Sequence, residues 1–432
     1  MADKAMPITR RTAALHPSPA QLRWQQAGVG VFFHFGLNTF AGVEWSDGTL
    51  QATSFDPTGL DARQWVAAAR IAGAKHVVLT AKHHDGFCLW PTATTDYSVA
   101  SSPWRDGKGD VVRELADACA EAGMGFGLYL SPWDRNAECY PDAAAYDDFY
   151  AAQLTELCTG YGDLVEVWFD GAGSAGREYD WKRITGIVRE HQPGAVIFNM
   201  GDPDIRWVGN EDGLAEDPVL YVSDWTPNDV FTETVLDFEP RYLPPECDVS
   251  LRHGWFWHPF DEPKTLEHLL GIHYRSVGLG ANLLLNVPPN RDGLIDDADL
   301  AVVEEYAAEL ARRFGAPVMA ALSQAEPGVW EAQFADAVEI DHLELTEELD
   351  AGQRVSAHRV LADDGPVCAG ETIGVRRLHP FGARTVRRLR IEVDGVEPVL
   401  TSVTGYRTGA ESAPVMPTVE EYRAPEADIV VM

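Results

Sequence analysis

Short apolar strands alternate with helical patterns from residue 29 to about residue 315, and this alternation limits the possible folds more than any other feature of the chain. Amphipathic segments such as DVVRELADACAEAG (110–123) end at a glycine, as helices commonly do. Strands that alternate with helices form parallel sheets with right-handed crossovers. The number of units favours an α/β fold, a (β/α)8 or TIM-type barrel, over an open sheet. The predicted strands cover residues 29–39, 76–87, 125–134, 164–171, 194–202 and 282–290.

The pattern changes near residue 317, where amphipathic helices stop. Short alternating segments separated by Gly, Pro and Asp turns follow, which is typical of antiparallel strands. They include RVSAHRVLA (354–362), TVRRLRIEVDG (385–395) and DIVVM (428–432). We therefore predict two domains, a barrel over residues 1–316 and a C-terminal antiparallel β-sandwich over residues 317–432. Within the barrel region, residues 203–262 are expected to form long loops over the barrel mouth, with one or two strands that the pattern does not place.

Charge, cysteine content and apolar content disfavour certain partners and indicate a compartment. The chain has 67 acidic against 34 basic residues and a formal net charge of −33, which disfavours nucleic acid and anionic membrane surfaces as partners. Its six cysteines show no paired or zinc-like spacing, which favours a reducing compartment. The first residues contain no apolar core of a signal peptide, and nowhere do eighteen apolar residues run together. We expect a cytoplasmic protein; the oligomeric state is not indicated.

Polar and aromatic side chains gather where the predicted strands end. The stretch LVEVWFDGAG (164–173) places Asp170 directly after a buried strand, where α/β barrels carry their catalytic groups. An Asp-Gly turn also explains this aspartate as a simple cap, so both interpretations stay open. Other strands end at His34, at the pair His83 and His84, and at Tyr129. Because the carboxyl ends of barrel strands share one rim, these groups are expected to converge.

Two kinds of chemistry fit such a cluster. Histidines with an aspartate can hold a metal ion for hydrolysis. Against a metal, the adjacent His83 and His84 are expected to point to opposite sides of an extended strand. Alternatively, aromatic faces stack on a sugar while imidazoles and carboxylates bind its hydroxyl groups. Cleavage of a glycosidic bond needs two carboxyl groups, and Asp170 supplies one; candidates for the other are Glu44, Glu211 and Glu246.

Several tracts together resemble the α-L-fucosidases of glycoside hydrolase family 29. They span residues 20–290 and include FFHFGLNTF, GVEW, AKHHDGFCLWPT, GLYLSPWD, VWFDGAG, WVGNEDG and ECDVSLRHGWFWH. The resemblance implies an irregular (β/α)8 barrel followed by a β-sandwich, a retaining mechanism and no metal or other cofactor. The WVGNEDG tract resembles the subgroup specific for α-1,3 and α-1,4 branches.

By the same resemblance, Asp170 is the nucleophile and Glu211 the acid/base, with Glu246 as the alternative acid/base or a substrate-orienting group. Arg206 is a weaker match to a pocket residue. The other positions that the resemblance assigns to fucose binding or to the pocket lining are His34, Glu44, Trp45, His83, His84, Tyr129 and Trp168.

These observations predict exo-hydrolysis of terminal α-L-fucose from oligosaccharides through a covalent fucosyl-enzyme, with Asp170 and Glu211 acting in turn. Two other functions remain at this stage. One is a barrel that binds fucosylated glycans without cleaving them, although the presence of both Asp170 and several candidate acids argues against it. The other is a metal-dependent barrel hydrolase.

Overall fold

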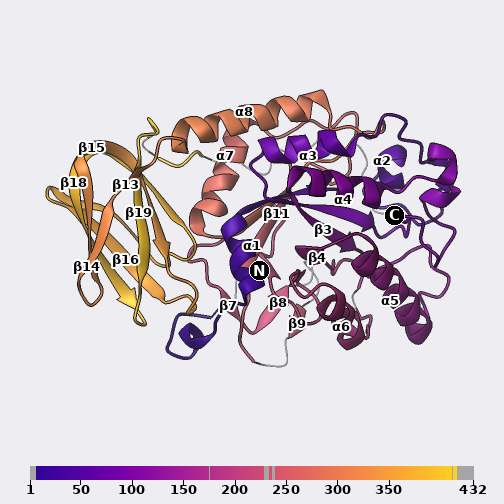
Figure 1. Cartoon of the computed structure of the whole chain (residues 1–432), viewed down its shortest axis with the longest axis horizontal. Coiled ribbons are helices and arrows are strands. Elements are labelled where there is room, and N and C mark those ends of the chain that lie inside the picture. Colours follow the sequence, from indigo (N-terminus) through magenta and orange to yellow (C-terminus); the bar gives the residue numbers. More distant parts are fainter. Residues whose placement is uncertain (1–5, 175, 228–232, 236–238, 411, 416–432) are drawn as a thin grey trace.

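The computed structural model describes residues 6–174, 176–227, 233–235, 239–410 and 412–415. The predicted strand at 428–432 lies outside these residues. Figure 1 shows a barrel of strands surrounded by helices, with the C-terminal β-sheet domain at one end of the molecule. Two separate clusters of buried apolar side chains form the cores of these two parts. No helix among the described residues is long and apolar enough to cross a bilayer.

The barrel is one eight-stranded, all-parallel sheet in the order β5-β4-β3-β2-β1-β12-β11-β6. A parallel bridge between Phe198, at the end of β5, and Ile205, just before β6, closes the two edges. The predicted TIM-type barrel is thus confirmed. Its strands are β1 (Val29–Phe33), β2 (His76–Lys82), β3 (Gly125–Leu130), β4 (Glu166–Trp168), β5 (Val196–Phe198), β6 (Arg206–Trp207), β11 (Pro245–Ser250) and β12 (Asn282–Asn286).

Polar side chains cap the amino ends of nearly all the helices around this barrel. Ser18, for example, closes a capping box at the start of α1 with Gln21, and Asp110 accepts a hydrogen bond from the Arg113 backbone N–H at 2.8 Å. Such caps satisfy N–H groups that lack a partner within the helix. The helices are α1 (Pro19–Ala27), α2 (Leu37–Ala41), α3 (Ala62–Ile71), α4 (Val111–Ala122), α5 (Ala143–Gly160), α6 (Trp181–His191), α7 (Leu266–Arg275) and α8 (Asp297–Phe314).

The segment between β6 and β11 leaves the barrel and forms two small antiparallel pairs. β7 (Val222–Ser223) pairs with β10 (Arg241–Tyr242), and β8 (Trp225–Pro227) pairs with β9 (Glu233–Val235). β6 and β11 are the barrel strands that the sequence pattern does not place within 203–262. β6 spans only two residues, and β11 carries inward-facing Glu246, Asp248 and Ser250 in place of apolar side chains. Neither therefore has the continuous apolar run that marks the other barrel strands.

The C-terminal domain is a seven-stranded antiparallel sheet that encloses its own core, which includes Trp330, Phe334 and Leu389. Two strands of 19 residues each, β15 and β18, contain register shifts, and such irregularities bend a strand. The sheet can therefore cover both sides of this core. Its strands are β13 (Val318–Met319), β14 (Ala321–Glu326), β15 (Val329–Glu347), β16 (Val355–Ala362), β17 (Gly365–Gly370), β18 (Arg377–Gly395) and β19 (Leu400–Tyr406).

The domain packs against the barrel through polar contacts that are buried or partly buried. Arg377 of β18 binds Asp217 with two bonds of 2.7 Å, and His342 of β15 bonds Tyr274 of α7 at 2.8 Å.

Candidate active site

Three histidines converge at the carboxyl ends of β1 and β2, around Tyr129 of β3. The rings of His34 and His83 are 5.7 Å apart, and those of His83 and His84 are 4.1 Å apart. Tyr129 stacks on His83 with ring centroids 5.7 Å apart and an interplanar angle of 15°. The expectation that His83 and His84 point to opposite sides is wrong. β2 ends at Lys82, so the two residues lie in the following turn, where strand alternation no longer applies.

Hydrogen bonds hold two of these imidazoles in defined tautomers. Asn286 uses its amide N–H groups to bond Ser250 and the Trp255 carbonyl, so its Oδ1 accepts from His34 Nδ1 at 2.9 Å. The Ser131 hydroxyl donates to the Trp133 carbonyl at 2.7 Å and therefore accepts from His84 Nδ1, also at 2.7 Å. Nδ1 carries the proton in both rings, which leaves Nε2 as an acceptor for a hydroxyl group.

Burial keeps the histidines neutral at physiological pH. It lowers the pKa of His34 and of His84 to about 3, and the pKa of His83 well below its ordinary value. The Asp170 carboxylate lies 3.6 Å from His84 Nε2, but burial, followed by the neighbouring His34, Arg135 and Lys82, keeps the pKa of His84 low. Neutral imidazoles among aromatic rings suit a ligand rich in hydroxyl groups rather than an anion.

Asp170 follows β4 at the same rim, and its side chain is 24% exposed. Its Oδ2 accepts a hydrogen bond from the Tyr129 hydroxyl at 3.0 Å, and its Oδ1 accepts from the Ala172 N–H at 2.9 Å. The second bond is the turn cap that the sequence allowed, so capping and a place in the site are compatible. Gly173 completes the turn at φ 70°, and a Cβ there would lie 2.0 Å from the Trp133 indole. The Gly-Ala-Gly sequence therefore lets the chain turn closely beneath an aromatic ring of the rim.

Glu211 and Glu44 both contact the segment that follows β11, which is another element of the site. The Trp255 indole N–H points to Glu211 Oε2 at 3.3 Å, while Glu44 accepts the backbone N–H groups of Trp255 at 2.9 Å and Phe256 at 3.3 Å. Glu211 is exposed as a residue, yet protein atoms crowd its carboxyl group. Loss of water raises the pKa of Glu211 most, Trp255 opposes this, and the Asp170 charge adds to it. Burial likewise raises the pKa of Glu44 to about 7.

Trp255 and Asp248 belong to the site, although neither was predicted individually from the sequence. The Trp255 ring lies 4.9 Å from that of His34, besides its contact with Glu211. Asp248 is 3% exposed and accepts from the Trp207 indole at 2.6 Å. Burial, followed by the charge of Glu211, raises the pKa of Asp248 well above its ordinary value. In the sequence, the WFW run and the acidic residues of ECDVS could have indicated these two positions. Neither stretch follows a recognisable strand, so neither could be placed at the barrel mouth.

Two of the remaining predicted residues border the histidine cluster. Trp45 is 42% exposed and packs edge-on against His84 at 5.4 Å, which places it at the outer rim. Trp168 is nearly buried beneath Tyr129, with ring centroids 5.6 Å apart.

Glu246 and Arg206 are not brought to the mouth. Glu246 lies near the amino end of β11, 1% exposed, and accepts from the Trp168 indole at 2.9 Å. Arg206 precedes Trp207 on β6 and donates to the Leu220 carbonyl at 3.0 Å. Trp207 reaches Asp248 inside the barrel, and consecutive strand residues face opposite sides, so Arg206 lies on the outer surface of the strand.

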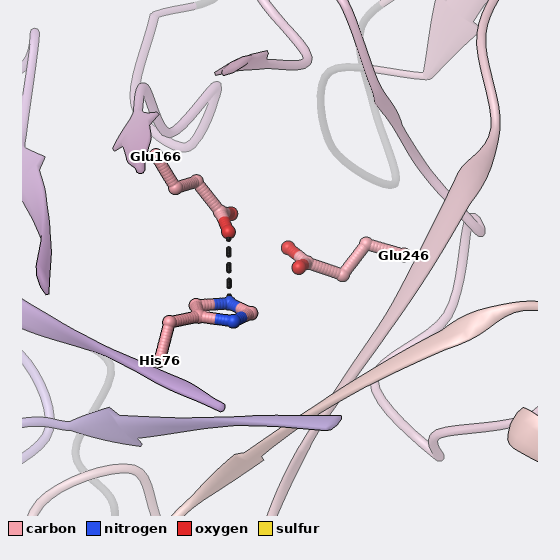
Figure 2. A group of neighbouring side chains, drawn as sticks. All are labelled: His76, Glu166 and Glu246. Atoms are coloured by element: carbon pink, nitrogen blue, oxygen red, sulfur yellow. Dashed lines mark ion pairs between the residues drawn. The ribbon is translucent and has the colours of Figure 1, made fainter. Parts of the chain in front are cut away.

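A group of possible metal ligands lies at the barrel floor. His76, Glu166 and Glu246 are buried, with one ligand atom of each within 4.8 Å of those of the others (Figure 2). Within the described ranges, no comparable group of three ligands forms at the mouth. The mouth thus combines carboxyl groups at two depths, neutral imidazoles and aromatic faces, which is a set suited to holding a sugar and cleaving its glycosidic bond.

Comparisons with known proteins agree with this geometry. A family model described as alpha-L-fucosidase matches residues 2–312. Alpha-L-fucosidase 1 of Arabidopsis thaliana is 41% identical over 433 residues, covering 88% of this chain and 84% of the relative.

Two solved structures extend the similarity to the fold. A crystal structure from Bacteroides ovatus is 41% identical with a TM-score of 0.87, over 94% of this chain and 76% of the other. A Ruminococcus gnavus GH29 fucosidase in complex with fucose is 28% identical with a TM-score of 0.80, over 94% and 97% of the two chains.

Proposed function

The chain belongs to the α-L-fucosidase family, glycoside hydrolase family 29, and we propose that it releases terminal α-L-fucose by double displacement with retention of configuration. The observation that carries this mechanism is Asp170, which is held at the barrel mouth by Tyr129 and the Ala172 N–H. A carboxylate with both oxygens hydrogen-bonded has a defined orientation, which nucleophilic attack at one carbon requires.

In the first step Asp170 attacks the anomeric carbon of fucose while protonated Glu211 gives its proton to the departing glycosidic oxygen. The C1–O bond to the aglycone breaks as the ester bond to Asp170 forms. In the second step Glu211, now a carboxylate, takes a proton from water, whose oxygen attacks C1 and releases Asp170. The raised pKa of Glu211 supports its role, because an acid must still hold its proton when the substrate binds.

His34, His83 and His84 would bind the sugar hydroxyl groups. As neutral rings they add no charge to the pocket, and each Nε2 lone pair of His34 and His84 can accept from a hydroxyl group. Trp255 supplies aromatic surface for the apolar face and the methyl group of fucose, while the buried Tyr129 ring supports His83. Water is excluded by the same rings, which strengthens the polar contacts with the sugar.

We further propose a preference for α-1,3- and α-1,4-linked fucose, as the WVGNEDG tract suggests. Glu211 and Trp45 lie at the exposed rim of the mouth, which leaves room for a branched aglycone. We also infer that the protein acts in the cytoplasm on small oligosaccharides, since all six of its cysteines are unpaired. Recovery of the folded protein chiefly outside the producing cells would contradict this location.

The test compares Lewis-type, α-1,2-fucosylated and aryl fucosides as substrates of the purified protein. We expect cleavage of the Lewis-type and aryl substrates, with a much lower kcat/KM for the α-1,2 linkage. NMR of the first product should show α-L-fucose before mutarotation. Asp170→Asn should abolish turnover while the protein remains folded, and the exposed-site variant Glu262→Gln is the control. Release of β-L-fucose first would refute retention, and equal rates on both linkages would refute the preference.

A further inference from the structure

His76, Glu166 and Glu246 lie at the opposite end of the barrel from the catalytic carboxyl groups. His76 and Glu166 are the first residues of β2 and β4, and Glu246 is the second residue of β11. All three side chains point into the barrel and face one another (Figure 2). Exposure is 4% for His76, 0% for Glu166 and 1% for Glu246, so solvent does not compensate their charges.

We call His76, Glu166 and Glu246 the floor triad. Two tryptophan indole groups donate hydrogen bonds to its carboxyl groups. The Trp24 indole donates to Glu166 Oε2 at 3.0 Å, and His76 Nε2 is 3.1 Å from the same oxygen. Trp168 donates to Glu246 Oε1 at 2.9 Å. The buried Glu166 Oε1 has no hydrogen-bond partner among the described residues. A proton on Glu246 would supply that partner.

Neighbouring strands keep space for the triad. A Cβ at Gly30 of β1 would lie 2.5 Å from His76 Nε2, and one at Gly127 of β3 would lie 3.2 Å from Glu166 Cβ. These distances leave no room for a larger side chain, so the strands around His76 and Glu166 carry glycine where other barrel interiors carry bulky residues. Glycines on two different strands, β1 and β3, therefore leave space for the floor triad.

We propose that Glu246 acts as a protonated positioning residue, which donates a hydrogen bond to Glu166 and holds the Trp168 indole in place beneath the sugar pocket. Two carboxyl groups facing each other in a dry interior are compatible when one of them keeps its proton. Burial raises the pKa of Glu246 well above its ordinary value, and the negative charge of Glu166 adds to this shift.

Trp168 connects the floor with the catalytic end. Its ring stacks on Phe198 with centroids 3.7 Å apart and an angle of 8°, and on Tyr129 with centroids 5.6 Å apart and an angle of 28°. Tyr129 in turn donates to Asp170. A displaced indole would therefore shift the phenol that orients the nucleophile. This role rests on the proposed function of Asp170, and Glu246 itself does not touch the reacting atoms.

The decisive comparison is Glu246→Gln against Glu246→Leu. Glutamine keeps an oxygen that accepts from Trp168 and an N–H that donates to Glu166, so it mimics the protonated acid. We expect kcat/KM within about twofold of wild type for Glu246→Gln, with an unchanged pH profile. Leucine removes both bonds; the loss of the one that positions Trp168 should lower kcat/KM by roughly tenfold, the factor that corresponds to one buried hydrogen bond. Glu347→Gln, at a buried carboxyl of the C-terminal domain that is 5% exposed, is the matched control.

A second measurement does not depend on catalysis. In protein with 15N-labelled tryptophan, the indole signal assigned by its loss in Trp168→Phe should keep its shift in Glu246→Gln and move in Glu246→Leu. If Glu246→Leu does not fold, Trp168→Phe replaces it in the assay and should lower kcat/KM by a similar factor. Failure of the Asp170 assignment would leave the indole shifts as predicted, so the two proposals are tested separately.

Three results would overturn the proposal. A loss of a hundredfold or more in Glu246→Gln, restored by azide, would make Glu246 the acid/base. Unchanged activity and an unchanged indole shift in Glu246→Leu would show that Glu246 does not position Trp168. Calorimetric binding of one equivalent of Zn²⁺ or Mn²⁺ by wild type, lost in Glu246→Gln, would instead identify the triad as a metal site.

Discussion

Removal of one hydroxyl group, in Tyr129→Phe, should slow the release of fucose from the enzyme. The Tyr129 side chain is fully buried, and its ring stacks on both His83 and Trp168. Phenylalanine preserves these contacts and removes the hydrogen bond of 3.0 Å with Asp170 Oδ2, together with the contact of the hydroxyl with Ser131. A hydrogen bond to a charged group contributes about 1.5–3 kcal/mol, which corresponds to roughly 10- to 150-fold in rate.

The two chemical steps should differ in how much they lose. Asp170 gives up negative charge when it attacks C1, so its bond from Tyr129 weakens on the way to the first transition state. The charge returns when the fucosyl ester is broken, and the bond then stabilises the second transition state. We therefore expect kcat on substrates with good leaving groups, which report the second step, to fall more than kcat/KM.

The assay is a pre-steady-state burst measurement with an aryl fucoside. In Tyr129→Phe the burst of phenol should approach one equivalent and be followed by a slow steady state. Tyr161→Phe is a matched control, because Tyr161 also donates to an aspartate, Asp110, at 3.0 Å but lies on the barrel flank. A kcat for Tyr129→Phe within twofold of wild type would refute the reasoning.

Three further predictions concern groups around the mouth. Glu211→Ala should lose most activity on natural glycans and less on aryl fucosides, with turnover restored by azide. Because the pKa of Glu211 is raised, wild-type kcat/KM should fall on the basic side at a pH above the ordinary pKa of a glutamic acid. A fall at that ordinary pKa would contradict its role. Lys82→Met should lower the free energy of unfolding in urea by about 3–5 kcal/mol, since it leaves buried Asp134 without the ammonium group 2.9 Å away; a loss below about 1 kcal/mol would show that the pair is dispensable. Burial raises the pKa of Glu44 to about 7, so the folded protein holds a proton that the unfolded chain releases above about pH 4.3. The free energy of unfolding of the wild type relative to Glu44→Gln should therefore fall as pH rises from about 4.3 to 7. A difference in this free energy that stays constant with pH in urea titrations would refute the prediction.

The sequence predicted the barrel because six of its eight strands are apolar runs that follow helical patterns. The other two could not be recognised for a physical reason. β6 is held by only two residues of pairing with β11, whose inward side chains are Glu246, Asp248 and Ser250. Its alternation of acidic and apolar residues lacks the continuous apolar run of a strand buried in a parallel sheet, and only the closed sheet gives those acids buried partners.

The candidate site was predictable where its residues follow recognisable strand ends. His34, Tyr129 and Asp170 are of this kind, and the structure brings them together. Trp255 was missed because its place depends on Glu44, 211 positions earlier in the chain, accepting its backbone N–H. The depth of Glu246 in the barrel was equally hidden, since sequence alone did not place β11 and hence could not tell its floor end from its mouth end.

The role of Asp170 as nucleophile can be tested by labelling the enzyme with a mechanism-based fluorinated fucosyl fluoride and sequencing the modified peptide by mass spectrometry. A good leaving group lets the ester form, and the fluorine slows its hydrolysis, so the intermediate accumulates. We expect one fucosyl adduct per chain, on Asp170, which disappears in Asp170→Asn. An adduct on another carboxyl group, or time-dependent inactivation without any adduct in the segment 164–173, would contradict it.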